Sequence, residues 1–311
     1  MNTIRVASRT SQLAMTQTNW VIDRLTEILP GTSFEVVPIR TKGDQILDVT
    51  LSKIGGKGLF VSEIEHALLH GEADIAVHSM KDVPYELAPG LQLAGIPKRE
   101  DPRDVVISAS GLPLNQLPNG ARVGTSSLRR VTQLRMVRPD FHIEPLRGNI
   151  DTRLRRVREG EFDAIVLAAA GLHRMGWQGQ ITEYLPPDVC LPAIGQGVLA
   201  VECRESDADL VAVLRRWSDR ETVEAVTAER ALLHGLQGSC QIPIGGYATL
   251  DDSGVIHLTG LVADPDGDAC VRESAAGTDP VQLGKALADK LLSLGADEWI
   301  AKAEARLKQD E

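Results

Sequence analysis

The sequence has few aromatic residues, few cysteines, a deficit of positive charge and no long apolar run. Aromatic side chains make up only 4% of the 311 residues, which argues against a surface that stacks nucleic-acid bases. Because 43 acidic side chains outnumber 33 basic ones and leave a formal net charge of −10, a general nucleic-acid-binding protein is also disfavoured. No apolar segment reaches the roughly 20 residues that a transmembrane helix needs. We therefore expect no nucleic acid and no membrane among the partners.

The cysteines indicate an intracellular protein without a metal site. The sequence contains four, and none of them forms the C-x-x-C pair that is typical of zinc sites. The first residues run directly into a strand-like segment, so we expect no signal peptide. We therefore expect a cytoplasmic protein with reduced thiols and no bound metal.

The length and apolar content predict more than one well-packed core. With 43% hydrophobic residues over 311 positions, two or three domains are expected. The first third alternates strand and helix patterns, beginning with a strand at 3–7, a helix at 12–29 and a strand at 34–40. A similar alternation starts again near residue 104. Repeated strand–helix units predict parallel sheets whose ligands bind at the carboxyl ends of the strands.

The pattern divides the chain into three predicted domains. A strand at 198–203 is expected to return to the first domain, and alternating strands after residue 222 indicate a different, α+β arrangement. A glycine-rich segment at 42–58 has no clear period and is the best candidate for a mobile lid. The predicted boundaries are 1–97 with 198–217 for the first α/β domain, 102–192 for the second, and 219–311 for the third.

Basic residues gather where predicted strands end and helices begin. Alone, each is most simply explained as an exposed surface charge. As a set they indicate an anion-binding cleft, because arginine in particular binds carboxylates through paired hydrogen bonds. Phosphate is less favoured, since the sequence lacks a G-x-x-x-x-G-K-[ST] loop. We therefore predict a site for a polycarboxylate small molecule, formed by these residues: Arg9, Lys53, Lys57, Lys81, Arg129, Arg130, Arg147, Arg153 and Arg174.

An acid and a thiol complete the candidate site. Asp82 follows a buried strand, and Cys240 lies in a stiff loop between Gly238 and Pro243. Asp82 is either a helix cap or a partner of Lys81, or else a carboxylate that stabilises a cationic intermediate and exchanges a proton. Cys240 is either a small residue packed under a turn or a thiolate used for covalent catalysis or attachment.

Two other functional classes remain open on these residues. A solute-binding protein also holds an anion between two α/β domains, although the expected lack of an export signal counts against it. A cysteine hydrolase requires a histidine beside Cys240, and His78 and His234 are the available candidates. Nothing in the spacing places either histidine next to the thiol.

Motifs spread over the chain match those of one enzyme family. They are His78-Ser-Met-Lys-Asp-Val-Pro84, Gly124-Thr-Ser-Ser-Leu-Arg-Arg130, Leu146-Arg-Gly-Asn149, Leu191-Pro-Ala-Ile-Gly-Gln-Gly197 and Gly238-Ser-Cys-Gln-Ile-Pro243. In order and spacing, from residue 3 to about residue 295, the chain resembles the porphobilinogen deaminase (hydroxymethylbilane synthase) family. Ser239 is a small departure, because this family usually has glycine before the cysteine.

The resemblance implies a fold, a cofactor and a set of site residues. The fold is α/β, with two similar periplasmic-binding-protein-like (type II) domains around a cleft plus a small C-terminal α+β domain with an antiparallel sheet. The cofactor is a dipyrromethane joined through a thioether to Cys240. The residues expected to hold the cofactor are Lys81, Arg129, Arg130 and Arg153, aided by Ser79, Thr125 and Ser127. Those expected to face the substrate are Arg9, Ser11, Phe60, Arg147, Arg174 and Gln196, with Lys53 and Lys57 on the lid.

The resemblance also implies a reaction. Four porphobilinogen units are deaminated and joined head to tail on the cofactor, and hydroxymethylbilane is released. Each unit carries an acetate and a propionate, so the growing chain accumulates carboxylates, which explains the cations. Asp82 is implied as the catalytic group that interacts with pyrrole N–H groups, assists the loss of ammonia and stabilises the cationic intermediate. A monomer is expected.

Overall fold

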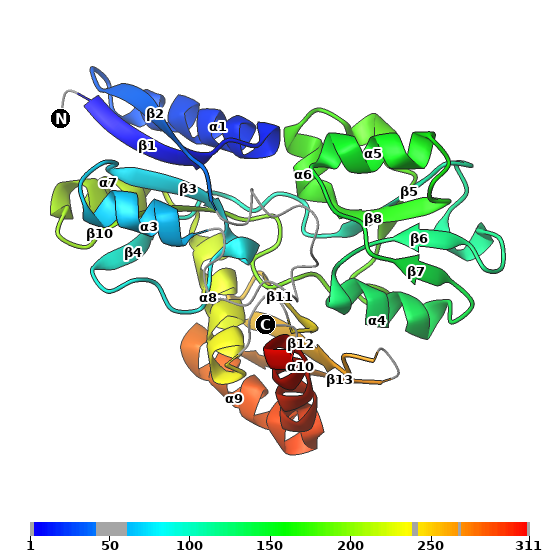
Figure 1. Ribbon diagram of the computed structural model, residues 1–311. Coiled ribbons are helices and arrows are strands. Elements are labelled where there is room, and N and C mark those ends of the chain that lie inside the picture. Colours follow the sequence, from blue (N-terminus) through cyan, green and yellow to red (C-terminus); the bar gives the residue numbers. More distant parts are fainter. Residues whose placement is uncertain (1–2, 42–60, 238–241, 267–268, 310–311) are drawn as a thin grey trace.

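The computed structural model describes residues 3–41, 61–237, 242–266 and 269–309. In these ranges the chain forms three lobes (Figure 1): two α/β lobes lie side by side, and a smaller third lobe lies against both. Each α/β lobe is built on one mixed sheet, and the third lobe on an antiparallel sheet. The predicted lid at 42–58 lies outside the described residues.

The first lobe is organised around a sheet in the strand order β2-β1-β3-β10-β4. Its strands are β1 (Thr3–Arg9), β2 (Ser33–Ile39), β3 (Ile75–Ser79), β4 (Leu91–Gly95) and β10 (Leu199–Arg204). β1 pairs in parallel with β2 and β3, whereas β10 runs antiparallel between β3 and β4. Its helices are α1 (Gln12–Ile28), α3 (Ser62–Leu69) and α7 (Ala208–Trp217). The Ser11 hydroxyl caps α1, and Val21 and Leu25 on one face of this helix pack into the apolar core.

The second lobe repeats this arrangement in the order β7-β6-β8-β5-β9. Its strands are β5 (Asp104–Ser108), β6 (Arg122–Gly124), β7 (His142–Glu144), β8 (Ala164–Ala168) and β9 (Glu183–Leu185), and its helices are α4 (Leu128–Val137), α5 (Ile150–Arg158) and α6 (Ala169–Arg174). β5 is antiparallel to β8 and β9, as β10 is to its neighbours in the first sheet. Two segments cross between the lobes: the outgoing segment, 96–103, leads into β5, and the returning segment, 186–198, leads into β10. Each therefore ends in an antiparallel strand that occupies the fourth position of its sheet.

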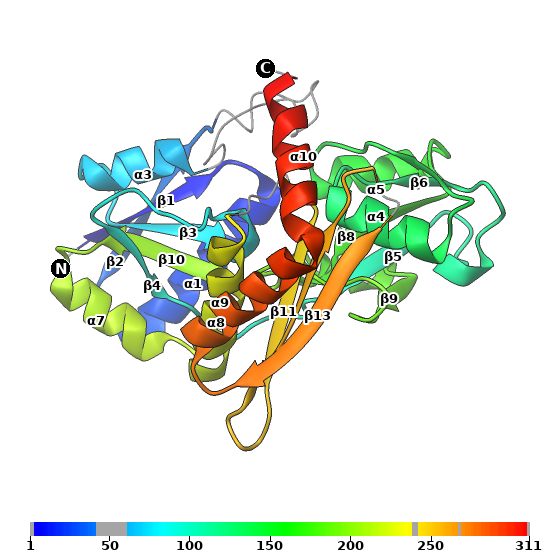
Figure 2. The same cartoon turned by 90° about the horizontal axis from the view of Figure 1, so that it is seen from below.

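The third lobe packs helices against a meander of antiparallel strands. The strands are β11 (Ile244–Leu250), β12 (Ile256–Ala263) and β13 (Cys270–Gly277), and the helices are α8 (Arg220–Gly235), α9 (Pro280–Leu291) and α10 (Asp297–Gln309). Burial alternates along β13, as expected for a sheet with one face exposed. Gly284 lets α9 approach α8 closely, because a Cβ atom there would lie 2.6 Å from the Cβ of Ala231. Seen from below, this lobe lies across both α/β lobes (Figure 2).

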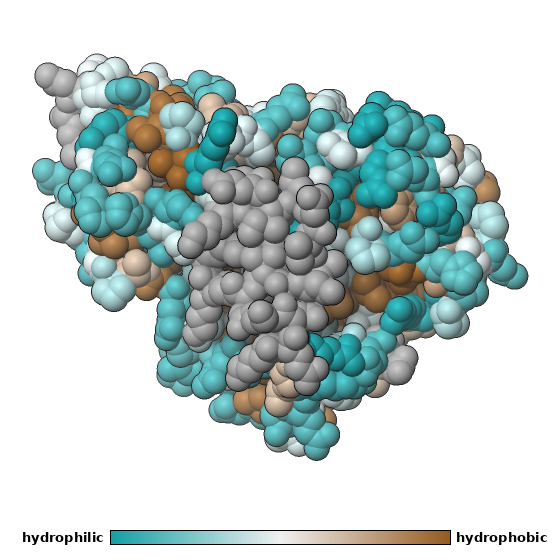
Figure 3. Space-filling view, viewed as in Figure 1, coloured by the Kyte–Doolittle hydropathy of each residue, from teal (hydrophilic) through white to brown (hydrophobic). Residues whose placement is uncertain are grey.

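Short helical turns join several of these elements. They are η2 (Met80–Asp82), η3 (Leu114–Gln116), η4 (Gln178–Gln180) and the wider turn Leu292–Ala296 between α9 and α10. Gly295 has a φ of 96°, which ends the helical path there. On the face shown in Figure 3, hydrophilic side chains cover most of both α/β lobes, and the apolar patches are small. No helix in the described ranges is both long and apolar enough to cross a membrane.

The structure confirms the predicted fold class. It has two similar α/β units of the periplasmic-binding-protein-like (type II) kind and a C-terminal antiparallel sheet with helices. The strand predicted at 198–203 is β10, and it joins the first sheet as expected. β11 begins at Ile244, and its Gly245 and Gly246 pair regularly with β12.

Candidate active site

Most of the predicted site residues lie at the carboxyl ends of parallel strands in the two sheets. Arg9 ends β1, and Ser79 ends β3. Lys81 and Asp82 follow at once in η2, where both are partly exposed. In the second lobe, the residues that follow β6, β7 and β8 are Thr125, Ser127, Arg129, Arg130, Arg147, Arg153 and Arg174. This is the edge at which α/β sheets bind ligands.

The turn that carries Lys81 and Asp82 is fixed by the segment that returns from the second lobe. The Met80 backbone N–H donates to Val198 O at 2.9 Å, and Val83 N–H closes the turn onto Met80 O at 3.1 Å. Gly195 has a φ of +70°, and a Cβ atom there would collide with Met80. Glycine is therefore required for the returning segment to pass so close to Asp82.

Arg129 and Arg130 meet at a buried acid that the sequence interpretation missed. Arg129 Nη1 donates to Asp104 Oδ2 at 2.7 Å, and Arg130 Nη2 donates to Asp104 Oδ1 at 2.7 Å. Burial alone would raise the pKa of Asp104, but the two guanidinium groups hold it well below its usual range. Asp104 begins the buried run Asp-Val-Val-Ile of β5, and a lone acid at the start of such a strand was the available signal.

Lys81 and Arg153 lack this kind of compensation. No ion pair joins either cation to an acid within the described ranges, and Arg153 Nε donates only to the Gly148 carbonyl at 2.7 Å. Burial, reinforced by Arg129 and Arg130 and opposed by nearby Asp82, lowers the pKa of Lys81 to about 8. Burial, together with Arg130 and Arg147, lowers the pKa of Arg153 to about 10. The two lobes therefore bring several cations close together around few negative charges.

Other predicted residues are partly engaged in local structure. Arg174 Nη2 donates to Gly197 O at 2.7 Å, and burial lowers its pKa to about 10. Gln196 Nε2 donates to Pro102 O at 2.7 Å and to Asp104 Oδ1 at 3.0 Å. Gln196 Oε1 and Arg129 Nε are among the buried polar atoms that have no hydrogen-bond partner in the described part of the chain.

The hydroxyl-bearing candidates also make local hydrogen bonds. Ser79 Oγ lies 3.2 Å from Gln17 Nε2, and Thr125 Oγ1 accepts from the Ser127 backbone N–H at 3.3 Å. Ser11 caps α1 through Ala14 N at 3.3 Å. The Ser79 hydroxyl also lies 3.3 Å from Gln17 Oε1, to which it can donate. Since a hydroxyl oxygen has two lone pairs, each of these hydroxyls can accept a further hydrogen bond.

Four predicted residues lie outside the described ranges: Cys240, Phe60, Lys53 and Lys57. The chain on either side of Cys240 is described, since α8 ends at Gly235 and the buried Ile242 precedes β11. The two histidines proposed for a hydrolase differ in their surroundings. His78 is buried, with Nε2 2.8 Å from Glu202 Oε2, and His234 is exposed and packs edge-on against Tyr85.

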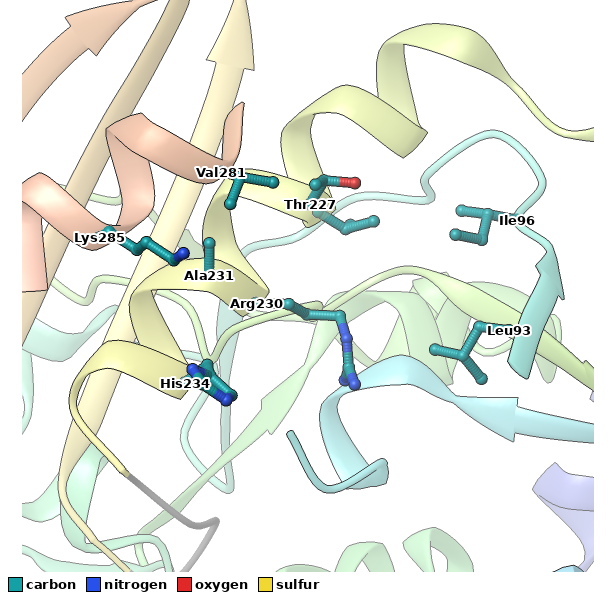
Figure 4. Close-up of a pocket in the computed structure, with 9 residues that line it drawn as sticks. Leu93, Ile96, Thr227, Arg230, Ala231, His234, Val281 and Lys285 are labelled. Atoms are coloured by element: carbon teal, nitrogen blue, oxygen red, sulfur yellow. The ribbon is translucent and has the colours of Figure 1, made fainter. Parts of the chain in front are cut away.

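A separate pocket of about 390 Å³ lies between the first lobe and the helices α8 and α9 (Figure 4). Its lining includes Arg230, whose Nη2 donates to Pro84 O at 2.8 Å and so ties α8 to the turn that follows Asp82. His234, one of the two histidines considered for a hydrolase, lines this pocket, but none of the cofactor- or substrate-binding candidates in the described ranges does, so it is distinct from the cation cluster. Within the described ranges, no group of three His, Cys, Asp or Glu side chains is arranged to hold a metal ion.

Comparisons with known proteins agree on one family. The family described as "Porphobilinogen deaminase, dipyromethane cofactor binding domain" matches residues 4–212, and "Porphobilinogen deaminase, C-terminal domain" matches residues 223–293. Porphobilinogen deaminase of Brevibacillus brevis is 55% identical over 298 residues, which cover 96% of each chain. The Bacillus subtilis protein of that name is 53% identical over 311 residues, covering 100% of this chain and 99% of the relative.

Solved structures with some likeness include the probable amino-acid transporter binding protein ytmK of Bacillus subtilis. It is 13% identical, with a TM-score of 0.43, and the match covers 69% of this chain and 89% of that one. The identities and coverage of the sequence relatives establish the affiliation, and the chain belongs to the porphobilinogen deaminase family.

Proposed function

We propose that this protein deaminates four porphobilinogen molecules, joins them head to tail on a covalent dipyrromethane primer, and releases hydroxymethylbilane and ammonia. The observation that carries the proposal is the cluster of cations around Asp82, in which Lys81 and Arg153 form no ion pair with an acid within the described ranges and have lowered pKa values. Such a cluster is stabilised when carboxylates bind, because each bound acid offsets the repulsion. The substrate and the growing chain supply those acids.

The residues present fit a dipyrromethane. Its carboxylates suit the donors of Lys81, Arg129, Arg130 and Arg153, and the buried Arg129 Nε offers a further donor. Ser79 at the end of β3, and Thr125 and Ser127 just before α4, add hydroxyl and backbone donors. Cys240 would attach the group through a thioether. When bound, the cofactor supplies the free pyrrole carbon from which the chain is extended.

A second set of residues would hold the incoming substrate. Arg9, Ser11, Arg147 and Arg174 lie at the carboxyl edges of the sheets or at adjoining helix ends. Gln196 Oε1 is a buried acceptor without a partner in the described ranges, and a pyrrole N–H or an ammonium group would satisfy it. Phe60 would pack against the substrate, and Lys53 and Lys57 would act from the lid.

Asp82 is the proposed catalytic residue. Its carboxylate can accept a hydrogen bond from the substrate pyrrole N–H. In its protonated form it can give its proton to the departing amine, which leaves as ammonia, and it can regain a proton from the attacking pyrrole carbon when the new carbon–carbon bond forms. It also stabilises the positive charge that develops as ammonia leaves, because it is the acid carried by the turn at the centre of the cation cluster. Lys81 beside it keeps the substrate carboxylates close to the reacting carbon.

The same proposal includes the organisation of the whole chain. The domains would be 1–97 with 198–217, 102–192 and 219–311, in a cytoplasmic monomer. The cation cluster lies where the first two of these meet, and Arg230 and Arg272 of the third bind backbone carbonyls of Pro84 and Asp188 in the others.

Intact mass after denaturation tests the proposal. Wild type should carry a permanent two-pyrrole increment, Cys240→Ser should carry none, and Cys270→Ser, at a partly exposed cysteine of β13, should match wild type. Asp82→Ala should keep the increment but turn over about a hundredfold more slowly or worse, the usual size of a lost acid–base group. A wild-type protein without the increment, as expected for a reversible solute-binding protein, or normal turnover in Asp82→Ala would contradict it.

A further inference from the structure

Asp104 is the most connected buried acid of the site. It is 0% exposed at the start of β5. Its oxygens accept from Arg129 and Arg130 at 2.7 Å each and from Gln196 Nε2 at 3.0 Å. The Cys190 thiol adds a longer contact of 3.3 Å. Three of these partners belong to the predicted cofactor and substrate sites, whereas Asp104 itself has no exposed surface with which to touch a ligand.

The two arginines are fixed on both sides by this network. Arg129 Nη1 also donates to Leu191 O at 2.5 Å, and Arg130 Nη1 donates to Val166 O at 3.0 Å. A planar guanidinium group held by two separate acceptors has one orientation. The direction of the remaining donors of Arg129 and Arg130 therefore depends on Asp104.

Asp104 also joins these cations to both segments that cross between the α/β lobes. Gln196 of the returning segment donates to Asp104 Oδ1 and to the carbonyl of Pro102, which lies two residues before Asp104 in the outgoing segment. Relative motion of two lobes is absorbed at such connecting segments. Moving one segment relative to the other must therefore strain or break a bond to this carboxylate.

We propose that Asp104 is a positioning residue for the reaction proposed above. It orients Arg129 and Arg130 towards the bound carboxylates and, through Gln196, fixes their position relative to the two crossing segments. This inference rests on the proposed function. This role differs from a purely structural one in its electrostatic effect on Lys81. Asp104 and Asp82 raise the pKa of Lys81 and so oppose Arg129 and Arg130, which lower it.

Cofactor acquisition by the apoprotein is the readout that tests this role. Wild type, Asp104→Asn, Asp104→Glu and the control Asp74→Asn are prepared in a host that makes no porphobilinogen. Each is mixed with porphobilinogen at a series of pH values, and intact mass follows the two-pyrrole increment with time. Asp74 is a matched control, because it pairs with Arg5 and Arg204 at 2.8 and 3.1 Å, just before β3 begins and at the opposite end of that strand from Asp82.

Asp104→Asn should acquire the increment about tenfold more slowly than wild type, the effect of losing one hydrogen bond to a charged group. The half-point, which is the alkaline pH at which the loading rate has fallen to half of its maximum, should also move to lower pH, since removing this acid favours neutral Lys81. Asp104→Glu keeps the charge but displaces it, so loading should slow while the half-point stays in place. If Asp104→Asn does not fold, slowed loading in Asp104→Glu supports the role and a wild-type loading rate contradicts it. Asp74→Asn should load like wild type.

Wild-type loading rates and half-points in both Asp104 variants would overturn the inference. Slowing of equal size in Asp74→Asn would overturn it as well, because the effect would then follow from lost stability. If wild type itself gains no increment from porphobilinogen, the proposed function fails instead, so the two failures are distinguishable.

Discussion

At the scale of single residues, Lys81 gives the site its sharpest pH dependence. Burial and the neighbouring Arg129 and Arg130 lower its pKa to about 8. The ammonium form binds carboxylates and the neutral amine does not, so anion binding by the apoprotein is present below this pKa and lost as pH rises through it. We expect the rate of cofactor acquisition to fall with a midpoint near pH 8, measured by intact mass.

Substitution of Lys81 provides the control for that midpoint. Lys81→Arg should keep the positive charge to higher pH and move the fall in loading rate upwards, because guanidinium groups ionise far above this range. Lys81→Met should load slowly at every pH. An unchanged midpoint in Lys81→Arg would show that another group titrates.

The sequence predicted the members of the cation cluster better than their connections. Lys81 and Arg153 lie close to Asp82 but form no ion pair with an acid in the described ranges, which leaves them able to bind an anion. Arg129 and Arg130 were expected to bind the cofactor, and the structure shows that both also bind Asp104. Spacing in the sequence does not reveal this, since the acid lies 25 and 26 residues before its two partners, with β5, η3 and β6 between them, and meets them only in the folded chain.

At the scale of elements, one buried ion pair joins α8 to the outgoing crossing segment. Arg99 donates to both carboxylate oxygens of Glu229 at 2.8 Å, and Glu229 also accepts from the backbone N–H of Gly195 and Ala248. Glu229→Gln leaves the guanidinium of Arg99 buried without a counter-charge. We expect a loss of about 3 kcal/mol in the free energy of unfolding, measured by urea denaturation.

The exposed pair Arg24–Glu27 on α1 supplies the contrast. Its two side chains are 49% and 62% exposed, so Glu27→Gln should change the free energy of unfolding by at most about 0.5 kcal/mol. Equal effects of the two substitutions would contradict the importance assigned to burial.

Close packing of α8 against α9 gives a second prediction at this scale. At Gly284, an added methyl group would meet Ala231 Cβ at 2.6 Å and the Leu232 backbone N at 2.7 Å. Gly284→Ala should lower the free energy of unfolding by about 2 kcal/mol, because the helices must separate. Gly179→Ala meets no atom within 4 Å and should be close to neutral in the same urea titration. A stabilised Gly284→Ala variant would contradict the close approach.

Local pattern predicted some elements, whereas others form only by pairing with distant strands. Helical periodicity predicted the helix at 12–29, which is α1, and its Val21 and Leu25 pack into an apolar core. β9 has only three residues, and β4 pairs with β10 more than a hundred residues later. Their strand character comes from partners distant in the sequence, which periodicity cannot show.

At the scale of the whole molecule, the two α/β lobes depend on each other for completion. The first sheet contains β10, which the chain supplies only after it has passed through the second lobe. β10 pairs with β3 and β4 on its two sides, so without it β4 loses its place in the first sheet. The first lobe should therefore not persist once the second has unfolded and freed the crossing segments.

The buried cysteines allow this coupling to be measured. Cys203 lies in β10 and Cys190 lies beside the second sheet, both are 0% exposed, and burial raises the pKa of each to about 12. Neither thiol should react with iodoacetamide at neutral pH in the native protein, because the thiolate is the nucleophile. In increasing urea both should become reactive over the same concentration range, as followed by peptide mass, while the partly exposed Cys270 should react first. Reaction of Cys190 at clearly lower urea than Cys203 would show that the second lobe opens alone, and the first sheet would then be stable without the continuity that β10 imposes.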